Sequence, residues 1–202
     1  MLPLAEKMRI AVPRTLQPWF ADDSASSGTA KDNPACLQYL MEHGTQYGYF
    51  PSPAKSWYIC KATDEPAALE AFEELNRPIQ MTRGHNYLGG FIGSAETKEM
   101  WVGDKISVWT AAVETLSKIA LKWPQTAYAG FTFVLQNEWQ YVQRVVAGIG
   151  SLFAPLERMI RDHFLLSLIE IPACEIDGDY RTLLSHSVKI GGTAVSTIPP
   201  KQ

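Results

Sequence analysis

The chain has 202 residues, of which 46% are hydrophobic and 19% charged; this composition is typical of a folded globular protein and excludes a disordered one. Its 18 basic and 21 acidic residues give a formal net charge of −3, and residues 1–93 and 94–202 each carry a slight acidic excess. This balance argues against strong autonomous binding to nucleic acid, because Lys and Arg contacts to phosphates supply most of that affinity.

The N-terminal part, residues 1–93, predicts short strands alternating with helices. An amphipathic helical stub opens the chain, with Leu4 and Met8 on one face. Apolar and aromatic residues before an Asp/Ser/Gly cluster then indicate a short β-hairpin whose tip holds Asp22 and Asp23. Adjacent carboxylates repel each other, so we expect this tip to be open to solvent.

Two helices, a strand and a second hairpin are predicted next, which places this part in the α+β class. Asn33 is a natural N-cap and Pro34 suits the first position of a helix that ends at Gly48. The remaining elements are a buried strand at 57–60, a helix from Thr63 or Asp64 to Leu75, and a hairpin over 81–92 with Gly84 and His85 near its turn.

A helical period begins near Thr97 and continues through three apolar stripes. Short connections between them predict an antiparallel helical bundle over residues 94–190. Residues 191–202, which contain one Gly-Gly pair and one Pro-Pro pair, are predicted to form a flexible tail. The stripes are Val102, Ile106, Trp109, Val113, Leu116, Ala120 and Trp123; Tyr128, Phe131, Leu135, Trp139, Val142 and Val146; and Leu156, Ile160, Phe164 and Leu168.

Neither a membrane span nor a disulfide framework is predicted. No run approaches the ~18 consecutive apolar residues of a transmembrane helix, and the N-terminus lacks the pattern of a signal peptide. Cys36, Cys60 and Cys174 are odd in number and far apart, which favours free thiols. We therefore expect an intracellular protein, cytoplasmic or nuclear, with no membrane partner.

Three segments in succession resemble the reverse transcriptase domain of non-LTR retroelements. WFADD at 19–23 is similar to the aromatic-x-Asp-Asp motif, and GYFPSPAKS at 48–56 is similar to the lysine-bearing loop of the polymerase palm. GHNYLGGFI at 84–92 is similar to the hairpin that grips the primer. The resemblance implies an RNA-directed DNA polymerase, a nucleotidyltransferase of retrotransposons, with part of the palm over 1–93 and a thumb-like helical bundle over 94–190.

The resemblance assigns chemistry to the Asp-Asp turn. Asp22 and Asp23 would be catalytic ligands of Mg²⁺, a cation that prefers oxygen donors. Phe20 would support the hairpin near the incoming nucleotide, and the catalytic Lys55 would offset charge on the leaving pyrophosphate. The residues by themselves leave an alternative open, in which the turn is a solvated acidic loop and Lys55 an ordinary exposed lysine.

The resemblance also implies a primer grip, formed by Tyr87, Leu88, Gly89 and Gly90. The two glycines would permit close approach, so that the turn presses the primer backbone toward the metal ions. The alternative is a plain β-turn with a leucine in the core.

The chain departs from the family in the elements that stand before Asp22. An active polymerase needs a further metal-binding aspartate on an earlier palm strand and a Gln-rich loop for template and nucleotide, and residues 1–21 contain neither. We therefore expect a reverse transcriptase-like fragment that is inactive alone and binds Mg²⁺ weakly or not at all. RNA template and DNA primer would be partners of the intact enzyme. The alternative is a non-catalytic interaction module, whose helical half binds another protein and whose Asp-Asp hairpin is vestigial.

Overall fold

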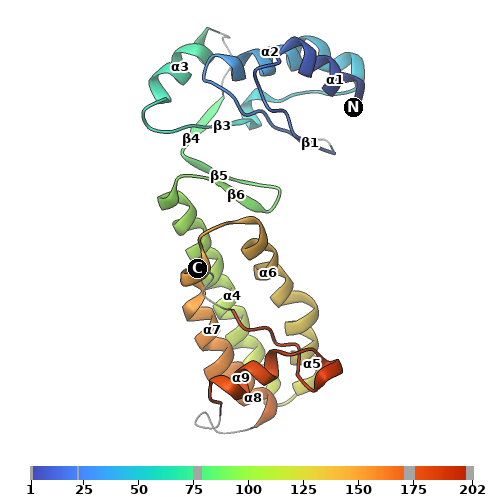
Figure 1. Cartoon of the computed structure of the whole chain (residues 1–202), viewed down its shortest axis with the longest axis vertical. Helices are drawn as coiled ribbons and strands as arrows, with labels where there is room; N and C mark the ends of the chain where they lie inside the picture. The colour runs from blue at the N-terminus through green and yellow to red at the C-terminus, as the bar shows by residue number, and fades with distance from the viewer. Residues whose placement is uncertain (1, 22, 75–78, 171–175, 199–202) are drawn as a thin grey trace. The chain divides into compact units, whose positions relative to one another are not determined.

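The fold divides into two compact units, residues 1–85 and 86–202, and each is described by itself (Figure 1). The first unit mixes short strands and helices, and the second is mostly helical, so the predicted α+β class is confirmed. The division falls within the second predicted hairpin rather than at residue 93. A computed structural model of the chain describes residues 2–21, 23–74, 79–170 and 176–198.

The first unit has a small core between α1 (Leu2–Ala11) and α2 (Asp32–His43). Leu4 and Met8 are fully buried on one face of α1, as predicted, and belong to one apolar cluster with Cys36 and Leu40 of α2. The opening segment is therefore an amphipathic helix that packs on the next helix.

The start of α2 differs from its prediction. Asn33 was expected to cap the helix, but α2 begins at Asp32, and Asn33 is buried inside the first turn. Its side-chain amide donates to the carbonyl of Gly28 at 3.1 Å, and its Oδ1 accepts from Ser26 Oγ at 3.0 Å. Asn33 thus fastens the preceding loop, and Pro34 stands in the first turn but not at its first position. The 3₁₀ helix η1 (Gly44–Tyr47) follows α2 and ends at Gly48.

The first hairpin forms where the Asp/Ser/Gly cluster predicts it. Strands β1 (Trp19–Phe20) and β2 (Asp23–Ser24) pair antiparallel, with Phe20 opposite Asp23. Ala21 adopts a φ of 51°, the left-handed conformation that tight hairpin turns require. Asp22 lies outside the described residues.

A β-α-β unit occupies the rest of the first unit. Strand β3 (Trp57–Ile59) pairs parallel with β4 (Gln80–Thr82), and α3 (Glu65–Glu73) lies between them in the chain. The predicted strand is therefore present but not buried, because Trp57 in this two-stranded sheet is 43% exposed. Met81 belongs to this parallel pair and not to the second hairpin. The predicted helix end at Leu75 lies outside the described residues.

The second hairpin is present, with its turn in a different place. It consists of β5 (Gly84–Tyr87) and β6 (Gly90–Gly93), so Gly84 and His85 lie in a strand. Leu88 (φ 48°) and Gly89 (φ 76°) form the turn, because two successive left-handed residues match the twist of paired strands.

The second unit is an antiparallel bundle of three helical rods, as predicted, with α9 and the C-terminal segment added to it (Figure 1). Proline is the first residue of α5 and the second of α7, in the first helical turn, where a missing N–H costs little. None of the helices in the described ranges is both long and apolar enough to cross a membrane. The elements are α4 (Ala95–Ala120); α5 (Pro124–Gly130), η3 (Phe131–Leu135) and α6 (Gln136–Val145); η4 (Gly150–Phe153), α7 (Ala154–Met159), η5 (Ile160–Phe164) and α8 (Leu165–Ile169); and α9 (Gly178–Ser185) and η7 (Val188–Ile190).

The predicted stripes form most of the core of the bundle. Trp109 packs against Trp139 and Phe153, with ring centroids 6.1 and 6.0 Å apart, and Phe131 stacks on Phe164 at 4.4 Å. Some stripe positions are less buried than predicted. Leu116, Tyr128, Leu135 and Leu168 are only partly buried, and Trp123 is 60% exposed because α4 ends before it.

Two π-helical turns interrupt the rods at η3 and η5. A π turn holds one residue more than an α turn, so it rotates the residues that follow. After η5 the buried position moves to Leu165, while Leu168 is only partly covered. The α-helical period alone therefore fails to predict the last buried position of this rod.

Residues 193–198 do not form the predicted flexible tail. They run across the bundle without regular secondary structure; Ala194 has a left-handed φ of 56°, and Val195 and Ile198 are buried. The amide of Thr193 donates to the carbonyl of Leu184, and that of Ala194 to the carbonyl of His186. Backbone and side-chain bonds to the bundle thus replace the solvent contacts expected of a tail, and residues 199–202 lie outside the described part.

Candidate functional site

The Asp-Asp hairpin of the first unit is an exposed tip on an anchored base. Phe20 is 63% exposed and Asp23 is exposed, while Trp19 is partly buried with its ring 5.7 Å from that of Tyr49. The hydroxyls of Ser24 and Tyr49 share a hydrogen bond of 2.6 Å. These contacts hold the two strands in place and leave the side chains of Phe20 and Asp23 exposed to solvent.

Asp23 is available as an oxygen donor to a cation. It forms no ion pair with any other described residue, so its carboxylate has no fixed counter-charge. Within the described ranges, no group of three or more His, Cys, Asp or Glu side chains could hold a metal ion.

Lys55 lies on the 3₁₀ helix η2 (Pro53–Lys55) and is exposed. This loop is tied to β4, where Gln80 Nε2 donates to the carbonyl of Ala54 at 2.6 Å. No hydrogen bond or ion pair joins Lys55 to Asp23 in the described part of the chain. Lys55 therefore lies in the loop before β3, which is hydrogen-bonded to β4.

The predicted primer-grip residues form a turn that lies on α6 of the second unit. The Tyr141 hydroxyl donates to the carbonyl of Leu88 at 2.5 Å. A Cβ added to Gly89 would lie 2.9 Å from Tyr141 Cε1, and one added to Gly90 would lie 3.2 Å from Val145 Cγ2. Gly89 thus permits close approach to a helix of the same chain, and a side chain at Gly90 would make a tight contact with Val145.

Tyr87 completes this turn with an unsatisfied polar atom. Its hydroxyl is buried and has no hydrogen-bond partner among the described residues. A buried donor without a partner costs stability.

An open groove of about 450 Å³ lies beside the turn, between α4 and α6. Its walls combine aromatic rings, one cation and one carboxylate. It is lined by Gly89, Lys105, Trp109, Asn137, Glu138, Tyr141 and Val142.

The charged groups of this groove are held by the tryptophans of α4. Trp109 Nε1 donates to Glu138 Oε2 at 2.8 Å. Lys105 Nζ lies 4.8 Å from the ring centroid of Trp101 and 5.8 Å from that of Trp109, within the range of cation–π attraction. A positive charge fixed against aromatic rings can bind an anionic group such as a phosphate.

The sequence did not identify most of this groove. Trp109 was predicted as a core residue, which it is, but its indole N–H also reaches the groove. Lys105, Glu138 and Tyr141 had no signal, because their roles depend on the contact between α6 and a turn about fifty residues earlier in the chain.

Comparison with the models of known protein families, with curated proteins and with solved structures finds no match to this chain.

Proposed function

We propose that this chain supplies the Asp-Asp hairpin and the thumb-like helices of a reverse transcriptase of the non-LTR retroelement type. The observation that carries the proposal is the β1–β2 hairpin, in which Phe20 of the aromatic-x-Asp-Asp segment lies opposite Asp23 and both side chains are exposed. In such an enzyme the primer 3′-hydroxyl attacks the α-phosphate of a nucleotide and pyrophosphate leaves.

The residues of this chain would have three roles in that reaction. Asp22 and Asp23 would hold Mg²⁺, which polarises the phosphate and stabilises the charge of both oxygens in the displacement. Lys55 would lie near the leaving pyrophosphate, and Phe20 near the nucleotide. The groove beside Gly89 would receive the primer backbone, with Lys105 as the cation nearest a phosphate.

The metal site can be tested by adding Mn²⁺ to isotopically labelled protein and recording amide signals. We expect selective paramagnetic broadening at residues 20–24, lost in the Asp22→Asn/Asp23→Asn double variant. Asp64→Asn removes an exposed carboxylate elsewhere in the same unit and is the matched control. Broadening that persists in the double variant, or that spares the hairpin, would refute the role of the turn.

The strand-binding role can be tested with a labelled RNA–DNA primer–template in a fluorescence anisotropy titration. With a net charge of −3 we expect weak binding that fades steeply as salt rises. Lys105→Ala should weaken it, whereas Lys122→Ala, on the turn before α5, should have a smaller effect. If the duplex does not bind even at low salt, the non-catalytic interaction module is the better reading.

A further inference from the structure

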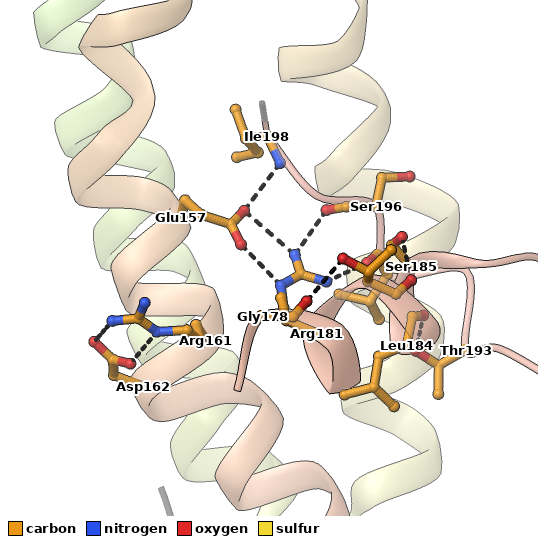
Figure 2. A network of polar contacts seen from close by, with 12 residues as sticks. Glu157, Arg161, Asp162, Gly178, Arg181, Leu184, Ser185, Thr193, Ser196 and Ile198 are labelled. Atoms are coloured by element: carbon orange, nitrogen blue, oxygen red, sulfur yellow. Dashed lines mark hydrogen bonds and ion pairs between the residues drawn. The ribbon is translucent and has the colours of Figure 1, made fainter. Parts of the chain in front are cut away.

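The C-terminal segment 193–198 is held by side chains that bind its backbone (Figure 2). Arg181 on α9 is 5% exposed and donates to two of its carbonyls, that of Val195 at 2.8 Å and that of Ser196 at 2.9 Å. The amide of Ile198 donates to Glu157 Oε2 on α7 at 3.0 Å. These hydrogen bonds are made to backbone groups of the segment and do not depend on its side chains.

The guanidinium of Arg181 is oriented by Glu157. Arg181 Nε donates to Glu157 Oε1 at 2.8 Å, and Nη2 donates to Oε2 at 3.3 Å (Figure 2). A bidentate pair fixes the fork of the arginine, so its remaining N–H groups point at the segment. The pair therefore builds one wall of a binding site.

Helix α6 provides the opposite wall. The side chain of Gln136 donates to the carbonyl of Ala194 at 3.1 Å and accepts from the amide of Ser196 at 3.3 Å. Gln140 Nε2 donates to Ser196 Oγ at 3.0 Å. One glutamine thus bonds a carbonyl and an amide of the segment, in the way a neighbouring strand would.

Two apolar side chains fix the register of the segment. Val195 and Ile198, three residues apart, are 0% and 6% exposed and belong to the core cluster of the bundle. Gly191, with a φ of 92°, stands just before the segment, where the chain turns away from η7.

We propose that the surface between α6, α7 and α9 is a docking groove for a peptide segment with two apolar residues three positions apart, as Val195 and Ile198 are. Residues 193–198 are its built-in occupant, and they exchange by pivoting at Gly191 without unfolding of the bundle. Recognition through backbone groups plus two apolar pockets is the way extended peptides are bound in general. This inference is independent of the proposed function.

Binding in trans tests the proposal in the full-length chain. The variant Val195→Asp/Ile198→Asp should release its own segment and bind a fluorescent peptide of residues 191–198 saturably. Wild-type protein should bind the peptide at least about tenfold more weakly, because its tethered segment competes at a millimolar effective concentration. Adding Arg181→Ala to the variant, or Asp for Val195 in the peptide, should abolish binding.

Hydrogen exchange of the wild-type chain provides a second measurement if the double variant fails to fold. The amides of Ala194, Ser196 and Ile198 should exchange faster than those of the buried stretches of α4 and α6, which open only with the bundle. Exchange of these amides at the rate of the core would overturn the proposal, and so would a folded double variant that does not bind the peptide.

Discussion

The Tyr141 hydroxyl donates a hydrogen bond to the carbonyl of Leu88, which joins α6 to the turn of the β5–β6 hairpin. The ring of Tyr141 can reach that carbonyl because Gly89 has no side chain. The Tyr-Leu-Gly turn is thus held by a helix of its own unit, and the groove beside it depends on this contact.

Gly89→Ala should destabilise the second unit and distort the groove. The new Cβ meets Tyr141 at 2.9 Å, and the φ of 76° disfavours any side chain. Gly48→Ala separates the two effects, because Gly48 has a similar φ of 72° but nothing within 4 Å. We expect a loss of about 1 kcal/mol for Gly48→Ala, set by the backbone conformation, and a larger loss for Gly89→Ala in urea unfolding. Equal losses would show that the contact with Tyr141 is not restrictive.

Glu138→Ala should cost more stability than Glu138→Gln. Trp109 is buried, and its indole N–H loses its acceptor in the alanine variant, at about 1–3 kcal/mol for an unsatisfied donor. A glutamine carbonyl still accepts that hydrogen bond. Urea unfolding measures the difference, and the indole ¹H shift of Trp109 reports the bond directly. An indole signal that does not change in the alanine variant would contradict the assigned hydrogen bond.

The purified 202-residue chain should not extend a DNA primer on an RNA template in Mg²⁺ or Mn²⁺. Phosphoryl transfer depends on positioning and on metal ions held by several carboxylates, and these residues provide one such turn, Asp22-Asp23. Asp22→Ala, checked by circular dichroism, is the control. Extension that this substitution abolishes would show that the chain holds a complete catalytic site.

The Cys60 thiol should be alkylated more slowly than a free cysteine at pH 8. Partial burial raises its pKa above the ordinary 9.0, and the carboxylates of Glu65 and Asp64 raise it further. The thiolate is the reactive form, so the rate should rise only at higher pH. Glu65→Gln removes one negative charge and should lower the pKa and speed alkylation, measured by peptide mass spectrometry. A slower reaction in that variant would contradict the electrostatic part of this explanation.

Gly192→Ala should detach the start of the C-terminal segment. A Cβ at this position would lie 2.1 Å from the carbonyl oxygen of His186, which is backbone and cannot move aside alone. Gly103→Ala, inside α4 with nothing within 4 Å, is the matched control and should stabilise the chain by about 1 kcal/mol. Faster exchange of the Ala194 amide in the first variant only is the expected result. Unchanged exchange in both would show that the tight turn at Gly192 does not hold the segment.

Signals from residues close together in the sequence predicted the helices and hairpins better than they predicted which elements pack against one another. The Asp/Ser/Gly cluster indicated the first hairpin, and the spacing of Val102, Ile106 and Trp109 indicated α4, because both signals act over a few residues. The parallel pairing of β3 with β4 and the groove at Gly89 depend on distant contacts. The same holds for the C-terminal segment, whose glycines and prolines indicated a tail while Arg181 and Gln136 bind its backbone.

The π turns of the second unit bear on how this bundle can change in length. Each of η3 and η5 accommodates one residue more than a regular turn, and one residue corresponds to about 100° of helix rotation. A single-residue deletion inside η5 would therefore leave a continuous α-helix in which Leu165 keeps its direction relative to Ile160, because the extra residue of the π turn is the one removed. Single deletions in these two turns are thus length changes that the rods can absorb with the same side chains facing the core, whereas a deletion in a regular α-helical turn would rotate the residues that follow.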